Sequence, residues 1–142
     1  MKAFFDTSVL IAAFLADHEH HAASLKALAG TPAKEGGCAA HTLAEVYATL
    51  TRLPSPLRVA PEHALLFIND LSERLHLITL TAAQYQDAVA AAAKNGVAGG
   101  AIYDALILQC AIKSNAATIL TWNLRDFRRI APNLTPIIKT PG

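Results

Sequence analysis

Charged residues are scarce in this 142-residue chain, where they make up 16% of the sequence against 53% hydrophobic residues. Disordered chains need high charge and low hydrophobicity, so this balance excludes disorder and favours a well-buried α/β or all-α domain. Strong net charge is also missing, because twelve Lys and Arg face eleven Asp and Glu, for a net charge of +1. A protein that binds nucleic acid by charge alone is strongly basic, so any contact with nucleic acid has to be local.

Long apolar runs and cysteine clusters are absent as well. No apolar stretch reaches the roughly 18–20 residues that a membrane-spanning helix needs. Asp6 interrupts the apolar N-terminus where a signal peptide would have its hydrophobic segment. Cys38 and Cys110 lie far apart, with no Cys or His at zinc-finger spacing, so we expect both to be reduced core residues. These features predict a cytoplasmic protein without membrane contact.

Short apolar runs alternate with helical patterns along the whole chain. We expect strands at 3–5, 37–40, 75–80, 118–121 and 136–138, separated by helices at 6–15, 22–29, 42–53, 61–71, 82–95, 102–114 and 124–130. Thr42 with Glu45 and Thr81 with Gln84 each match a capping box, in which two side chains bond the first helical turn. The alternation is typical of a parallel sheet covered on both faces. No repeat or boundary divides residues 1–142, so we expect a single domain.

Polar side chains follow two of the predicted strands at the point where each strand ends. Asp6 comes directly after the first strand, and Asn123 and Asp126 follow the fourth. Ligands bind outside the carboxyl ends of parallel strands, so these side chains are expected at one edge of the sheet. The sequence leaves open a local alternative, in which Asp6, Thr7 or Ser8 simply caps the helix that follows.

An acidic residue interrupts the most apolar helix of the chain. Asp104 is the only acid between positions 101 and 113, where nearly every residue is apolar, so we expect this helix to be largely buried. A carboxylate in the first turn can favour the helix dipole, or it can bind a metal from a rigid support. A partly buried acid without a partner is costly, and this favours the functional interpretation of Asp104.

Glu45 lies on the polar side of its predicted helix. The apolar stripe of that helix consists of Leu43, Val46, Tyr47, Leu50 and Leu53. Glu45 points away from this stripe, toward a flank of small residues that would let a phosphate backbone approach closely. The predicted capping box with Thr42 also explains Glu45, and for this residue taken alone the local explanation is the stronger one.

Two other clusters contain side chains that could bind ligands. The segment 18–21 holds three His and one Glu and resembles a transition-metal site, but no further Cys or His follows at ligand spacing. A solvated helix end is therefore the favoured interpretation. Trp122 and Phe127 could stack on bases, although anchoring a core or loop is the commoner role of such a pair.

Taken in order, four segments resemble the PIN-domain ribonucleases, and most of all the VapC-type toxins of bacterial toxin–antitoxin pairs. The resembling segments are 5–10, 43–54, 102–107 and 120–127, which together extend over nearly the whole chain. Each segment alone is weakly diagnostic, whereas four in this order are fairly specific. The resemblance implies a three-layer α/β/α sandwich around a mostly parallel sheet, with the acids gathered in one pocket.

By this resemblance, Asp6, Glu45 and Asp104 are catalytic carboxylates and metal ligands. The family places an acid or Asn just after the fourth strand, so Asn123 and Asp126 compete to be the fourth metal ligand, and Asp126 is the candidate that supplies charge. Carboxylates without Cys or His select hard cations, so Mg²⁺ or Mn²⁺ is expected rather than Zn²⁺.

Neighbouring polar residues are candidates for contacts with RNA. Thr7, Ser8 and Thr121 could hold a metal-bound water close to the substrate. Three arginines follow the fourth strand and could position phosphates: Arg125, Arg128 and Arg129.

The resemblance further implies an endoribonuclease that acts on RNA, forms a homodimer and binds an antitoxin protein that blocks the acidic pocket. Two rival functions stay open. A catalytically inactive PIN-like RNA- or protein-binding module is disfavoured because the three principal acids are all present. An aspartate-dependent phosphatase or phosphotransferase is disfavoured because the phosphatase pattern needs an Asp where this chain has Ser8, and no receiver-type Asp and Lys pairing is found.

Overall fold

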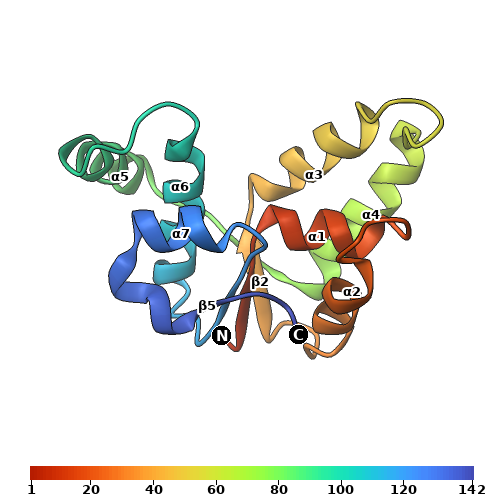
Figure 1. Cartoon of the computed structure of the whole chain (residues 1–142), viewed down its shortest axis with the longest axis horizontal. Helices are drawn as coiled ribbons and strands as arrows, with labels where there is room; N and C mark the ends of the chain where they lie inside the picture. The colour runs from red at the N-terminus through yellow and green to blue at the C-terminus, as the bar shows by residue number, and fades with distance from the viewer.

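Five short strands form a parallel sheet at the centre of the computed structural model, which describes residues 1–142 (Figure 1). The strands are β1 (Ala3–Phe5), β2 (Gly36–Ala39), β3 (His76–Ile78), β4 (Ile119–Leu120) and β5 (Ile138–Lys139). Their order across the sheet is β3-β2-β1-β4-β5, and every neighbouring pair is parallel. The predicted parallel sheet is confirmed, and β1 lies at its centre.

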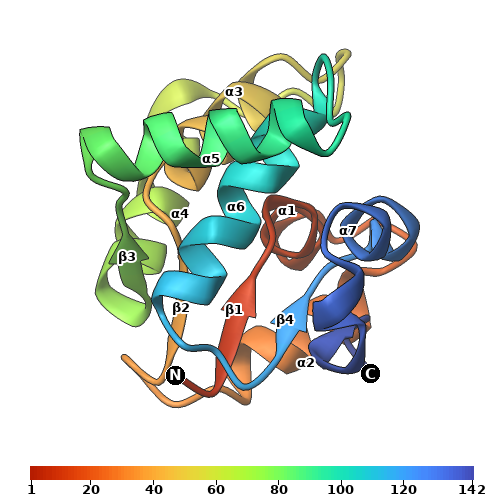
Figure 2. The same ribbon diagram turned by 90° about the vertical axis from the view of Figure 1, so that its left-hand side faces the viewer.

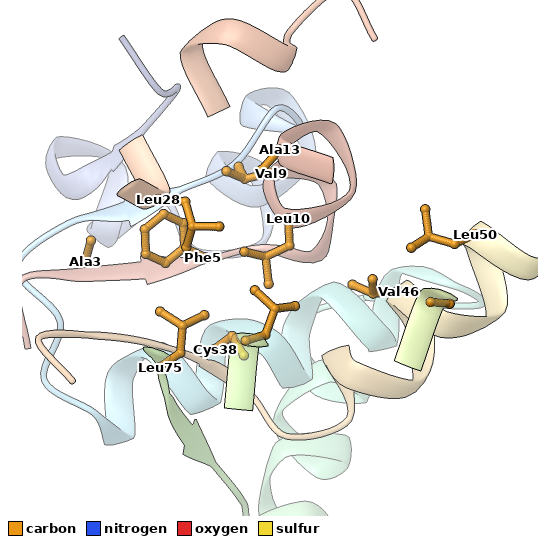
Figure 3. Packing of buried hydrophobic residues seen from close by; sticks show 12 residues of the cluster. Ala3, Phe5, Val9, Leu10, Ala13, Leu28, Cys38, Val46, Leu50 and Leu75 are labelled. Carbon is orange, nitrogen blue, oxygen red and sulfur yellow. The ribbon is translucent and has the colours of Figure 1, made fainter. Parts of the chain in front are cut away.

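Side chains that alternate along β1 and β2 give the sheet two buried faces. Phe4 and Phe5 are both fully buried but belong to different core clusters, as do Cys38 and Ala39 on β2. Figure 3 shows the cluster around Phe5, to which Leu10 and other residues of the first helices contribute. Both cysteines are buried and free, as predicted.

Helices cover both faces of the sheet, so the predicted three-layer α/β/α sandwich is confirmed (Figures 1 and 2). The Phe5 face is covered by α1 (Thr7–Phe14), α2 (His21–Ala29), α3 (Thr42–Thr51) and α4 (Pro61–Arg74). The Phe4 face is covered by α6 (Ala101–Lys113) and α7 (Leu124–Ile130), and α5 (Ala82–Lys94) packs on α6. No helix combines the length and hydrophobicity that crossing a membrane requires.

The two predicted capping boxes have different outcomes. At α5 the box is confirmed: Gln84 N donates to Thr81 Oγ1 at 3.2 Å, and Thr81 N donates to Gln84 Oε1 at 2.8 Å. At α3 the prediction is wrong, because the N-cap residue is His41 and no side chain caps the helix. Thr42 lies inside α3, and its buried hydroxyl shares a 3.0 Å hydrogen bond with Thr7 instead. Glu45 therefore has no capping role.

Two further expectations differ from the structure. The helix around Asp104 is only partly buried, because Tyr103 and Ile112 are 61% and 49% exposed. The last strand begins at Ile138, and the preceding residues form a 3₁₀ helix, η1 (Pro132–Ile137). Pro136, which has no N–H to donate to a neighbouring strand, lies within η1.

Candidate active site

Asp6 lies at the carboxyl end of the central strand and is almost completely buried, with 2% of its surface exposed. Its Oδ2 accepts two hydrogen bonds, from Ser8 Oγ at 2.7 Å and from Thr121 Oγ1 at 2.8 Å. Thr121 directly follows β4, which is the neighbour of β1 in the sheet. The structure therefore confirms that the ends of these two strands meet at one edge.

The alternative that Asp6 is a helix cap has little support in the structure. Asp6 occupies the N-cap position of α1, but its side chain makes no hydrogen bond of capping geometry. Burial raises the pKa of Asp6, while hydrogen bonds from Ser8 and Thr121 and the nearby N–H groups of Thr7 and Ser8 lower it. The Asp6 carboxylate is therefore held by the hydroxyls of Ser8 and Thr121, although the residue itself lies at the start of α1.

The loop between β4 and α7 orients the hydroxyl groups of Ser8 and Thr121. Trp122 N donates to Ser8 Oγ at 3.1 Å, and Asn123 N donates to Thr121 Oγ1 at 2.9 Å. Each hydroxyl accepts a hydrogen bond from this loop and donates its own hydrogen to Asp6 Oδ2. The loop backbone therefore orients the Asp6 carboxylate through Ser8 and Thr121.

Asp104, in the first turn of α6, shares the electrostatic environment of the other three predicted acids. Burial raises the pKa of Asp104 to about 6, with further contributions from the negative charges of Asp6, Asp126 and Glu45. Arg129 offsets part of this effect. The fold therefore gathers four carboxylates from four helices or helix termini into one region of negative charge.

Within this region the carboxylates remain apart. No group of three or more His, Cys, Asp or Glu side chains is close enough to hold one ion. Glu45 Oε1 lies 3.0 Å from His41 Nε2 without hydrogen-bond alignment, and Asp126 Oδ1 lies 3.5 Å from Arg129. Of the four carboxylates, only Asp126 has an arginine partner, and Asp6 and Asp104 form no ion pair at all.

The remaining candidate residues surround this region in different ways. Asn123 is exposed at the N-terminus of α7, and Arg125 is exposed in its first turn. Arg128 donates to the Ile138 carbonyl at 2.9 Å and thereby ties α7 to β5. Phe127 is fully buried in the core.

Two features of the site were not predicted from the sequence. His41 lies one helical turn from Glu45, and the ring of His20 stacks on Trp122 with centroids 3.7 Å apart. The segment 18–21 was expected to be a solvated helix end, but the ring of His20 is packed against Trp122 and is not simply solvated. Because 101 residues separate the two rings, no local pattern could have indicated this contact.

Comparison with known proteins identifies the family of the chain. The family model of the PIN domain matches residues 3–132. Ribonuclease VapC40 of Mycobacterium tuberculosis is 39% identical over 120 residues, which are 84% of this chain and 85% of that protein. Ribonuclease VapC27 of the same organism is 34% identical over 111 residues, which are 78% and 77% of the two chains.

Solved structures show the same fold. VapBC2 from Rickettsia felis, crystallised with a DNA fragment from its promoter, has a matching chain with a TM-score of 0.66 at 24% identity, covering 99% of this chain and 98% of that one. VapC20 of Mycobacterium tuberculosis, described as a toxin that cleaves the sarcin–ricin loop, has a TM-score of 0.67 at 19% identity, covering 83% and 87%. The family model and the curated relatives together show that this chain belongs to the PIN-domain family.

Proposed function

We propose that the chain is a metal-dependent endoribonuclease and the toxin of a toxin–antitoxin pair. The observation that carries the proposal is the gathering of four carboxylates in one region: burial, and after it the negative charges of Asp6, Asp126 and Glu45, raise the pKa of Asp104 to about 6. Clustered carboxylates that repel one another are suited to binding a cation. The relatives named ribonucleases point to RNA as the substrate, which would place the activity in the cytoplasm.

The donor atoms at this edge of the sheet fit Mg²⁺ or Mn²⁺. All four carboxylates and the Asn123 amide offer oxygen ligands, which hard cations prefer. Mg²⁺ is commonly held by one or two carboxylates and keeps several waters. Asp6 and Asp104, which form no ion pair, suit direct binding, while Glu45, Asp126 and Asn123 suit contact through water. Held by these residues, such an ion would supply an activated water for attack on a phosphodiester and positive charge against the developing negative charge.

The chain's own side chains prepare the site for this role. Ser8 and Thr121 orient Asp6 and favour its ionised form, because hydrogen bonds to a carboxylate lower its pKa. The Thr7 hydroxyl is bonded to Thr42 and thereby helps to hold α3 in place beside α1. We therefore propose that Thr7 positions the site and does not itself contact the ion or the RNA. Among the arginines, Arg125 and Arg129 are exposed and suited to phosphate contacts, whereas Arg128 is engaged by the backbone.

The products of RNA cleavage test this proposal. The purified protein should cut mixed RNAs with Mg²⁺ or Mn²⁺ and should be inactive in EDTA. A water nucleophile leaves the 2′-hydroxyl unused, so the new ends should be 5′-phosphate and 3′-hydroxyl. Full activity in EDTA, or 2′,3′-cyclic phosphate ends, would contradict the proposed mechanism.

A small antitoxin protein and a second copy of the chain are the proposed partners. The VapBC2 neighbour supports the pairing, because it is named as a VapBC assembly bound to a DNA fragment from its promoter. Exposed apolar residues on and before α4 offer surface for an interface: Leu57, Leu65 and Leu66. A monomer by light scattering at micromolar concentration would contradict the dimer. Harmless overexpression in its own host, with the antitoxin gene deleted, would contradict the toxin role.

A further inference from the structure

Two aromatic rings from distant parts of the chain stack beside the candidate active site. The rings of His20, just before α2, and Trp122, just after β4, are nearly parallel, with an interplanar angle of 9° and centroids 3.7 Å apart. His18 adds a third ring, 5.7 Å from that of His20 and tilted by 43°. The rings thus form a short aromatic series that begins at Trp122.

Trp122 is fixed from two sides and lies close to Asp6. Its Nε1 donates to Ser24 Oγ at 2.8 Å, and Ser24 is fully buried. Its backbone N donates to Ser8 Oγ, which in turn donates to Asp6 Oδ2. Two consecutive hydrogen bonds therefore connect the Trp122 backbone to the carboxylate at the centre of the site.

His20 is held less firmly and remains accessible. Its side chain is 37% exposed, and its one charged neighbour is Glu19, at 3.5 Å, whose side chain is 82% exposed. The backbone N–H of His20 donates to His18 Nδ1 at 3.0 Å, which joins the two histidines in one turn. The ring pair therefore combines a fixed inner member with an outer member that reaches solvent.

The low net charge of the chain leaves room for a contact with RNA that does not depend on charge. The net charge is only +1, and the site itself gathers four carboxylates that repel phosphates in the absence of a cation. Stacking of bases on aromatic rings does not depend on net charge and accepts any base. Histidine and tryptophan rings both serve this purpose in proteins that bind single-stranded RNA.

We propose that the His20–Trp122 pair is a binding subsite for a nucleobase of single-stranded RNA. The base stacks on this ring pair. The RNA strand that carries the base then passes the carboxylates around Asp6. This proposal rests on the ribonuclease function proposed above and adds to it the residues that hold the strand. Since stacking is independent of base identity, the subsite positions RNA without selecting a sequence.

Binding of a labelled RNA to a variant that does not cut it tests the subsite. The parent is the full chain with Asp104→Asn, in EDTA, and the probe is a 5′-fluorescein single-stranded RNA octamer followed by anisotropy. Adding His20→Ala should weaken binding about 5- to 100-fold, and His20→Phe should restore it to nearly the parent value. His76→Ala, an exposed histidine on the edge strand β3, is the matched control and should bind like the parent. An octamer of abasic ribose phosphates should bind weakly to all four proteins.

Kinetics separate the subsite from a role in fixing the β4–α7 loop. With Asp104 intact and Mg²⁺ present, His20→Ala should raise KM and leave kcat unchanged, because the base contact precedes the chemical step. A lowered kcat at unchanged KM, unaltered octamer binding by His20→Ala, or equal binding of the abasic octamer would each overturn the subsite. Absence of any RNA cleavage by the wild-type chain would instead contradict the proposed ribonuclease function.

Discussion

Thr121 donates a 2.8 Å hydrogen bond to Asp6 Oδ2 across 115 residues of sequence. The bond forms because β1 and β4 are parallel neighbours, so the residues that follow them meet at the same edge of the sheet. It lowers the pKa of Asp6 against the effect of burial. This hydrogen bond thus links the ends of β1 and β4 and favours the ionised form of Asp6.

Replacing Thr121 by Val should weaken both effects. Asp6 would lose one of its two hydroxyl donors while remaining buried, which should lower the free energy of unfolding at pH 7.5 by about 1–3 kcal/mol. The pKa of Asp6 should rise further, so the acidic limb of the pH–rate profile should move to higher pH. Urea unfolding and cleavage rates between pH 5 and 8 measure the two effects.

Thr121→Ser keeps the hydroxyl and is the matched control. It should retain the wild-type acidic limb, with at most a small loss of stability from the missing methyl group. A Val variant whose pH–rate profile overlays that of wild type would show that the Thr121 hydroxyl does not influence Asp6.

Asp104→Asn should stabilise the metal-free protein in a way that depends on pH. The folded pKa of about 6 exceeds the usual value of an Asp, so between about pH 4 and pH 6 the folded chain keeps a proton that the unfolded chain has released. Stability therefore falls as pH rises through this window, and the penalty is complete above pH 6. The Asn variant avoids it and should gain about 1–2 kcal/mol at pH 7.5, allowing for solvent screening of a half-buried group.

Urea unfolding in EDTA at pH 4 and pH 7.5 tests this linkage. The gain should be present at pH 7.5 and nearly absent at pH 4. Asp87→Asn, at an exposed position on α5, provides the control and should change stability little at either pH. A destabilised Asp104→Asn at pH 7.5 would indicate that the carboxylate chiefly supports the helix terminus.

Addition of Mg²⁺ should stabilise the wild-type chain. An ion that binds only the folded state contributes about 2.7 kcal/mol at one hundred times its dissociation constant. For a domain of this size, the melting temperature should rise on the order of 5–15 °C. Asp6→Asn and Asp104→Asn should each show a much smaller rise, because each removes a carboxylate that forms no ion pair and is proposed to bind the ion directly. An equal rise in melting temperature for wild type and both variants would show that the ion does not bind at Asp6 and Asp104.

The order of elements and the meeting of strand ends could be predicted from the sequence. Alternating apolar runs and helical patterns specify a parallel sheet, and such a sheet brings Asp6 beside the residues after β4 whatever their separation in sequence. The box at Thr81 and Gln84 was also predictable, because both of its hydrogen bonds join residues three positions apart in one turn, and Gln84 Oε1 keeps its bond to Thr81 N although Lys113 Nζ also donates to it at 2.8 Å.

Contacts that depend on packing could not be predicted in this way. Thr42 and Glu45 match the same capping pattern as Thr81 and Gln84, but the Thr42 hydroxyl is buried against Thr7, which no local rule includes. The stack of His20 on Trp122 likewise requires α2 and the β4–α7 loop to be in place. Local patterns therefore located the acids and the nearby hydroxyl residues, while the hydrogen bonds from Ser8 and Thr121 to Asp6 and the ring stack became visible only in the folded chain.

Rates of RNA cleavage by variants of the four acids test the central claim most directly. Asp6→Asn, Glu45→Gln, Asp104→Asn and Asp126→Asn each remove one charge while nearly preserving shape, and Asp87→Asn is the control. At pH 7.5 with Mg²⁺, we predict that the first three lose about 100-fold or more in rate, that Asp126→Asn loses more than Asn123→Ala, and that the control cuts like wild type. Folded Asp6 and Asp104 variants that cut RNA as fast as wild type would contradict the account.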